Sequence, residues 1–129
     1  VGPVMPRDKP RCRMGGGTPY NIIEAVARGV DMFDCVMPSR NARHGTVFTW
    51  DGILHITNAC YETDPQPLDP NATALSARTS PEEQLAGRLA VTPNLYFYNT
   101  LLEKIREALD EDRFGAFRSE YSEKLAQRI

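Results

Sequence analysis

The chain has 129 residues, enough for one domain, with 41% hydrophobic and 25% charged residues. This composition is typical of a globular protein, and it excludes a disordered or fibrous chain. The formal net charge of −2 excludes a domain that binds nucleic acid through bulk basic charge. Charge is nevertheless uneven: residues 1–45 hold seven basic and four acidic side chains, a balance of +3 that leaves −5 for the rest.

The N-terminal segment and the cysteines indicate where the protein works. The stretch 1–6 has no secretory-signal pattern, and it lacks an initiating Met, which favours a processed, trimmed or fragmentary chain. No apolar run approaches the roughly 20 residues of a membrane helix, so no membrane partner is expected. Three irregularly spaced cysteines, Cys12, Cys35 and Cys60, favour free thiols. We therefore expect a cytoplasmic protein, or one of an organelle matrix after processing.

The first third predicts a strand, a helix and a second strand. A short strand at 11–14 runs into three glycines, and Thr18 with Pro19 is typical of a helix start. Gly29 is a plausible helix stop. The apolar run 32–37, bounded by a proline, predicts the second strand. The order indicates a parallel pair with a right-handed crossover.

The remainder predicts a hairpin and helices. The runs 46–50 and 53–57 are strand-like and joined at Asp51-Gly52, a strong hairpin signal. Residues 62–81 are loop-like, and a capping-box pattern around Glu83 predicts a short helix. The longest helix is expected to open at Thr92-Pro93. Its predicted buried stripe consists of Leu95, Tyr98, Leu102, Ile105 and Leu109, and a last helix presents Phe117, Tyr121 and Leu125.

Asp34 is an acid inside an otherwise apolar strand-like run. It is either a structural acid, paired with an arginine or near water at a strand end, or a functional carboxylate at the carboxyl end of a parallel strand. Barrel enzymes place catalytic groups at such ends. Arg40 and Arg43 follow in a predicted loop between Pro38 and Gly45. They suit recognition of phosphates or base edges, although solvated surface arginines give the same pattern.

The glycines 15–17 lack both the Walker lysine pattern and a GxGxxG spacing. A flexible turn that lets a ligand approach the backbone explains them more economically. Met14, just before them, is either a core residue or a ligand contact.

Several motifs in a fixed order carry a resemblance. They are Asp8-Lys9-Pro10-Arg11, Met14-Gly15, Gly17-Thr18-Pro19, Gly29 through Pro38, Arg40 through Gly45, Phe48, Asp51-Gly52, Ile56, Asn58-Ala59 and Pro67-Leu68-Asp69-Pro70. A weaker match returns at Asn94-Leu95 and Tyr98. In this spacing the chain resembles the bacterial tRNA-guanine transglycosylases over roughly residues 5–70.

The resemblance implies an α/β fold: the C-terminal portion of a (β/α)8 TIM-type barrel with a β-hairpin insertion and C-terminal helices. Residues 1–61 would be the final βα units plus the hairpin, 62–93 a loop-rich remnant of the family's metal subdomain, and 94–129 the helices. A complete barrel needs about 250 residues. The missing strands are therefore expected in another chain or in an N-terminal barrel half.

The resemblance also implies a pentosyl transfer on tRNA. Guanine at the anticodon wobble position is exchanged for a prequeuosine- or queuine-type base, with Asp34 as the nucleophile of a covalent RNA intermediate. Met14 and Gly15 would line the base pocket. Ser39, Arg40 and Arg43 would read the flanking nucleotides of the anticodon loop.

Departures from the family pattern leave an alternative open. Alanines at 72, 74 and 77 stand where the family has zinc-binding cysteines, and the histidine position falls near Pro93, so no zinc or other cofactor is expected. Cys12 stands where an aromatic usually stacks on the base. The alternative is a catalytically inactive family fragment that serves as an RNA-binding or structural subunit of a larger assembly. In either case we expect the isolated chain to be inactive.

Overall fold

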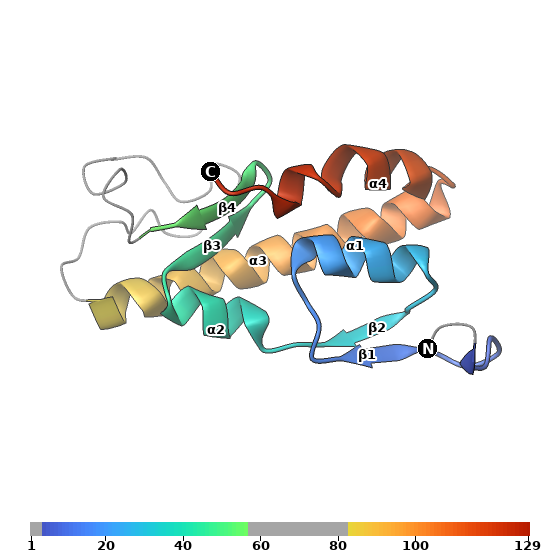
Figure 1. The fold of residues 1–129 in the computed structure, drawn as a ribbon, viewed down its shortest axis with the longest axis horizontal. Helices are drawn as coiled ribbons and strands as arrows, with labels where there is room; N and C mark the ends of the chain where they lie inside the picture. The colour runs from blue at the N-terminus through green and yellow to red at the C-terminus, as the bar shows by residue number, and fades with distance from the viewer. Residues whose placement is uncertain (1–3, 57–82) are drawn as a thin grey trace.

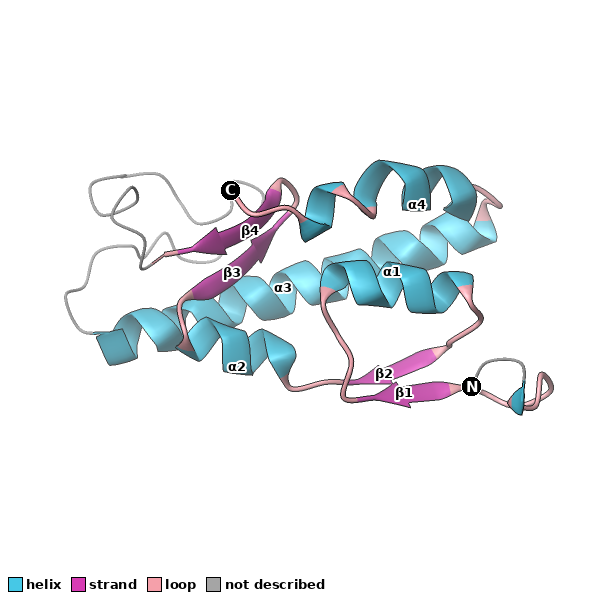
Figure 2. Cartoon of the chain, in the orientation of Figure 1, coloured by secondary structure: helices cyan, strands magenta, loops and turns pink. Residues whose placement is uncertain are grey.

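The computed structural model describes residues 4–56 and 83–129, without the side chains of 83–89, and shows a mixed α/β structure (Figures 1 and 2). The elements in chain order are β1 (Cys12–Met14), α1 (Pro19–Ala27), β2 (Met32–Asp34), α2 (Met37–Arg43), β3 (Thr46–Thr49), β4 (Gly52–His55), α3 (Glu83–Asp110), α4 (Phe114–Tyr121) and the 3-10 turn η3 (Lys124–Ala126). None of the described helices is long and apolar enough to cross a membrane.

The predicted strand–helix–strand unit is confirmed. β1 and β2 pair in parallel, with Cys12 opposite Met32 and Met14 opposite Asp34. The connecting helix α1 begins where the sequence indicates: the Thr18 side chain accepts a hydrogen bond from the backbone N–H of Asn21, and a proline occupies the first turn.

The expected second strand is shorter than the predicted range 32–37, and the expected loop after Pro38 is wrong. β2 ends at Asp34, and Met37–Arg43 forms the helix α2. Pro38 fits into the first helical turn, where its missing N–H leaves no hydrogen bond unmade. The N–H of Arg40 donates to the Val36 carbonyl at 2.9 Å, and Gly45, with φ +72°, follows the helix end.

The hairpin is confirmed, with its turn one residue earlier than expected. β3 and β4 are antiparallel, and Thr49 pairs with Gly52, so Trp50-Asp51 forms the two-residue turn. Gly52 has φ +141°, a conformation that side-chain-bearing residues rarely adopt. The outer edge of β4 is also occupied: the Ile53 N–H donates to the Gln127 carbonyl at 2.8 Å, and the Ile129 N–H donates to the Ile53 carbonyl at 3.1 Å.

The long helix α3 starts earlier than expected and buries a different stripe. It runs through Pro93, so the boundary expected at 93/94 falls inside it, and a helix start at 92 is wrong. Leu95 and Leu109 are 46% and 50% exposed, which contradicts their place in the predicted stripe. The buried positions among the described side chains of α3 are Ala90, Pro93, Asn94, Phe97, Tyr98, Leu101, Ile105 and Ala108. Small and polar residues in the true stripe explain the error.

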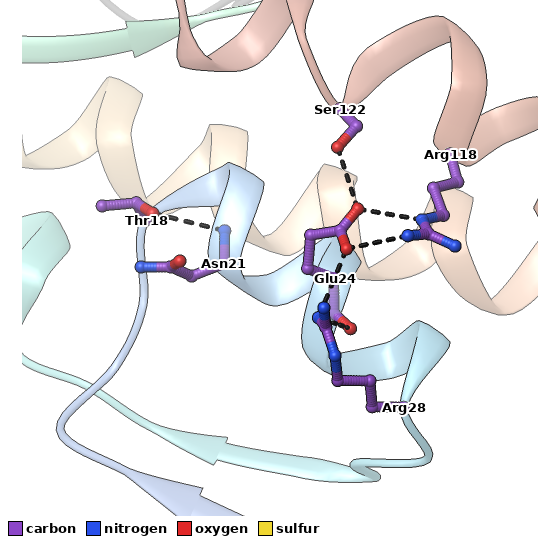
Figure 3. A network of polar contacts seen from close by, with 6 residues as sticks. All are labelled: Thr18, Asn21, Glu24, Arg28, Arg118 and Ser122. Atoms are coloured by element: carbon purple, nitrogen blue, oxygen red, sulfur yellow. Dashed lines mark hydrogen bonds and ion pairs between the residues drawn. The ribbon is translucent and has the colours of Figure 1, made fainter.

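The main core lies where α1, α3 and α4 meet the hairpin. Figure 1 shows α1 and α4 side by side along α3. Phe117 and Leu125 are buried and Tyr121 is half-buried, as the sequence predicts, but Leu125 lies in η3 and not in the last helix. The Glu24 carboxylate joins α1 to α4 through Arg118 and Ser122 (Figure 3). In the described ranges, the strands form two separate two-stranded sheets and no closed barrel.

Candidate functional site

The carboxyl ends of β1 and β2 meet at one point. Met14 lies opposite Asp34 in the strand register, and the Gly15 N–H donates to the Asp34 carbonyl at 2.9 Å. The structure thus brings together three of the residues that the sequence singles out. Gly15 has φ +75°, so the chain turns here in the left-handed region that glycine favours.

Asp34 lies on the open face of this small sheet. Alternation along the strands places Cys12, Met14, Met32 and Asp34 on one face. Met14 and Met32 are 75% and 54% exposed, and Asp34 is exposed as well. Phe33 packs against the core from the opposite face. Within this chain Asp34 is therefore an accessible carboxylate at the end of a parallel strand.

The predicted RNA-contacting residues lie on α2, which begins three residues after Asp34. Arg40 and Arg43 are exposed and share a helix face, since residues three apart are neighbours on a helix. Ser39 is half-buried. The arginines are consequently held by regular structure rather than by a loop, and they form a local cationic face next to the carboxylate in sequence.

Two buried residues of α3 contact the segments around Asp34. The Tyr98 hydroxyl donates to the Gly17 carbonyl at 2.5 Å. Asn94 is fully buried and hydrogen-bonds to the Pro38 carbonyl of α2 at 3.0 Å. Sequence reasoning missed both roles. Asn94 is a lone asparagine among apolar helix positions, in a segment of weak resemblance, and this pattern could have indicated a buried hydrogen-bonding role for it.

The described residues do not fit the zinc that the resemblance implies. The alanines at 72, 74 and 77 lie outside the described ranges and carry no metal-ligating atom. Pro93 is buried in α3 and offers none either. Within 4–56 and 83–129, no group of three or more His, Cys, Asp or Glu side chains is placed to hold a metal ion. Cys12, at the position of the expected aromatic, is an exposed free thiol.

Comparison with known proteins relates this chain to one enzyme family. A family model described as "Queuine tRNA-ribosyltransferase" matches residues 1–127. The queuine tRNA-ribosyltransferase of Francisella tularensis subsp. novicida is 50% identical over 127 residues, which cover 91% of this chain and 35% of that protein. The corresponding protein of Clostridium kluyveri is 47% identical over 139 residues, covering 100% of this chain and 37% of its own length. This chain thus spans about a third of the length of these relatives, and it belongs to the queuine tRNA-ribosyltransferase family.

Proposed function

We propose that this chain is the C-terminal part of a tRNA-guanine transglycosylase, which exchanges guanine at the anticodon wobble position for a prequeuosine- or queuine-type base. Family membership supports the reaction class. The observation that carries the proposal is the hydrogen bond from the Gly15 N–H to the Asp34 carbonyl. This bond holds the glycine turn, which would contact the base, beside Asp34, which would be the nucleophile.

Asp34 acts as the nucleophile in this proposal. Its carboxylate oxygen attacks C1′ of the target ribose, and the glycosidic C–N bond breaks as guanine leaves with the bonding electron pair. The departing guanine takes up a proton. The incoming base then attacks C1′ through a nitrogen, gives up the proton of that nitrogen and displaces the carboxylate, which restores Asp34. Met14 and Gly15, at the neighbouring strand end, would contact the base during both steps.

The helix α2 supplies the RNA-contacting groups. Arg40 and Arg43, on one exposed face, would donate bidentate hydrogen bonds to flanking bases of the anticodon loop, each worth about 1–3 kcal/mol of discrimination. Ser39 would add a hydroxyl contact. These groups follow the nucleophile by five to nine residues, which suits contacts to neighbouring nucleotides.

The unit β1–α1–β2 would be the last strand–helix–strand part of a (β/α)8 barrel. The remaining strands would come from another chain or from the other part of the same protein. A flipped base must be held on both faces, and two short strands provide one side only.

The decisive experiment is Asp34→Asn in the assembly that contains the rest of the barrel. Wild type is expected to form a covalent RNA adduct that survives a denaturing gel, and the variant is expected to form none. Asp31→Asn is the matched control, since Asp31 is three residues away and its carboxylate accepts the Arg11 N–H. An adduct that persists in Asp34→Asn would show that another residue is the nucleophile.

A second function is a catalytically inactive RNA-binding or structural subunit. The exposed thiol of Cys12, at the position of the expected stacking aromatic, favours it. In that case wild type forms no adduct with any barrel partner, while Arg43→Ala still weakens binding to an anticodon stem-loop.

A further inference from the structure

We propose that Asn94 and Tyr98 of α3 are positioning residues for the Asp34 site. Tyr98 holds the glycine turn 15–17, which follows β1. Asn94 holds the first turn of α2, which follows β2 and Asp34. This inference rests on the proposed function in taking Asp34 as the centre of the site.

Tyr98 reaches the turn from 81 residues further along the chain. Its hydroxyl donates to the Gly17 carbonyl at 2.5 Å, and its side chain is only 7% exposed. Gly17 is buried and packs closely against Cys35. A Cβ on Gly17 would overlap the Cys35 sulfur. The turn is therefore held between the phenol and the residue that directly follows Asp34.

The phenol is itself held in place. Its ring meets Phe48 edge-on, with 5.4 Å between centroids, and Phe97 edge-on at 5.9 Å. Burial raises the pKa of the Tyr98 hydroxyl, and the adjacent Cys35 raises it further, so the hydroxyl stays protonated at neutral pH. It is a permanent donor to the Gly17 carbonyl.

Asn94 makes three hydrogen bonds from a fully buried position. Its side-chain oxygen accepts from the Phe48 N–H at 2.9 Å, and its side-chain NH2 donates to the carbonyls of Thr46 and Pro38, both at 3.0 Å. Pro38 lies in the first turn of α2, directly before Ser39. Asn94 thereby joins α2 to β3.

Both contacts come from one turn of one helix. Residues 94 and 98 are four apart and so lie on the same face of α3. The segments that follow β1 and β2 are consequently both hydrogen-bonded to the same helix, α3. A shift of α3 would move the glycine turn and α2 together relative to Asp34.

Tyr98→Phe tests the first contact, because it removes the hydroxyl and keeps the ring. The measurement is the alkylation rate of Cys35 by N-ethylmaleimide, resolved by peptide mass spectrometry, since Gly17 packs against the sulfur of this half-buried residue. We expect the alkylation rate of Cys35 to rise about 2- to 12-fold. This is the increase in the opening equilibrium that corresponds to the loss of a hydrogen bond with a net contribution of ~0.5–1.5 kcal/mol. The exposed Cys12 is the internal reference and should not change.

Tyr96→Phe is the matched control: the same chemical change on the same helix, at a side chain that is 40% exposed. It should leave Cys35 labelling unchanged. Equal Cys35 labelling in Tyr98→Phe and wild type would overturn the proposal. So would an equal rise in amide exchange throughout α1, because that indicates global unfolding rather than a freed turn.

The side-chain amide protons of Asn94 test the second contact in the wild-type chain. They should exchange with solvent at least about 100-fold more slowly than those of Asn99, which is exposed on the same helix. Asn94→Asp removes both donated bonds and should speed amide exchange in the first turn of α2 while α1 stays protected. Equal exchange of the Asn94 and Asn99 amides would overturn this part, whether or not the variant folds.

Turnover of the assembled transglycosylase separates positioning from simple stability. Tyr98→Phe should lower kcat for base exchange with little change in KM for RNA, whereas Asn94→Asp should raise that KM because α2 carries Arg40 and Arg43. Unchanged kinetics in both would overturn a positioning role. If the wild-type assembly has no activity, the proposed function fails, and the labelling and exchange results still decide whether these contacts hold the site segments.

Discussion

The carboxylate of Glu24 is the point at which α1 is fastened to α4. Arg118 donates to its two oxygens from Nε and Nη2 at 2.9 Å each, and Ser122 donates at 3.2 Å (Figure 3). Arg28, one turn further along α1, pairs with the same carboxylate at 3.2 Å. Chiefly because of the Arg118 hydrogen bonds, the pKa of Glu24 lies below its ordinary value of 4.5.

This lowered pKa predicts a loss of stability in acid. The contribution is fully present above the ordinary pKa of a glutamate, and it is lost as the pH falls through the lower pKa of the folded state. In denaturant titrations between pH 7 and pH 3, Glu24→Gln should therefore flatten the fall of the unfolding midpoint relative to wild type. Glu103→Gln, at an exposed position of α3, should leave the slope as it is. Identical slopes for wild type and Glu24→Gln would contradict the assignment.

At the scale of elements, α1 depends on its first turn. The Thr18 hydroxyl accepts the Asn21 N–H at 3.3 Å, which satisfies one of the free donors at the helix start. Thr18→Ala should cost about 1 kcal/mol of unfolding free energy, and Thr18→Ser should cost little, because serine also caps. Thr92→Ala, at an exposed position within α3, is the control and should not lower stability. A Thr18→Ala midpoint equal to wild type in chemical denaturation would refute the cap.

Elements with local signals were predictable from the sequence. Thr18-Pro19 marks a helix start, and Asp51-Gly52 marks a hairpin, because both patterns act within a few residues. The helix α2 has no apolar periodicity to reveal it. What holds its first turn is Asn94, 56 residues away, and such a contact leaves no trace in the local pattern.

The candidate site divides in the same way. The meeting of Met14, Gly15 and Asp34 follows from the parallel order of two strands, so the sequence could indicate it. Tyr98, in contrast, reaches this site through the hydrogen bond of its hydroxyl to the Gly17 carbonyl, 81 residues away in the sequence. Its period-matched position in α3 indicates burial, but burial alone does not reveal which carbonyl the hydroxyl binds.

For the molecule as a whole, the open face of the β1–β2 sheet predicts association of the isolated chain. Met14 and Met32 on this face are 75% and 54% exposed, Val36 just after β2 is 71% exposed, and strand edges with free backbone groups pair readily. Light scattering should show concentration-dependent oligomers at micromolar concentration. Met32→Lys should reduce them, while Leu109→Lys, at a 50% exposed position of α3, should not. A monomer at every concentration would disprove this.

The residues at positions 72, 74, 77 and 93, where the family has zinc ligands, predict that the chain binds no zinc. Four-coordinate zinc needs thiolate, imidazole or carboxylate ligands in fixed geometry, and alanine and proline provide none. Elemental analysis of the dialysed chain should find well below one zinc per molecule, and a chelator should leave the thermal midpoint unchanged. One tightly held zinc per chain would show that other residues supply the ligands.

The pairing of Ile53 with residues 127–129 determines when the edge of β4 can be paired during synthesis of the chain. The ribosome makes β4 about 75 residues before its neighbour, which at ~5–20 residues per second is a delay of roughly 4–15 s. Asn94, which bonds to the backbone of β3, is itself made 46 residues after Phe48. The hairpin therefore emerges with both of its edges open. Asn94 can bind the β3 edge once that part of α3 has been made, but the β4 edge stays open until the residues after α4 have been synthesised. During translation this hairpin therefore offers unpaired strand edges to a chaperone before the helices that later enclose it are complete.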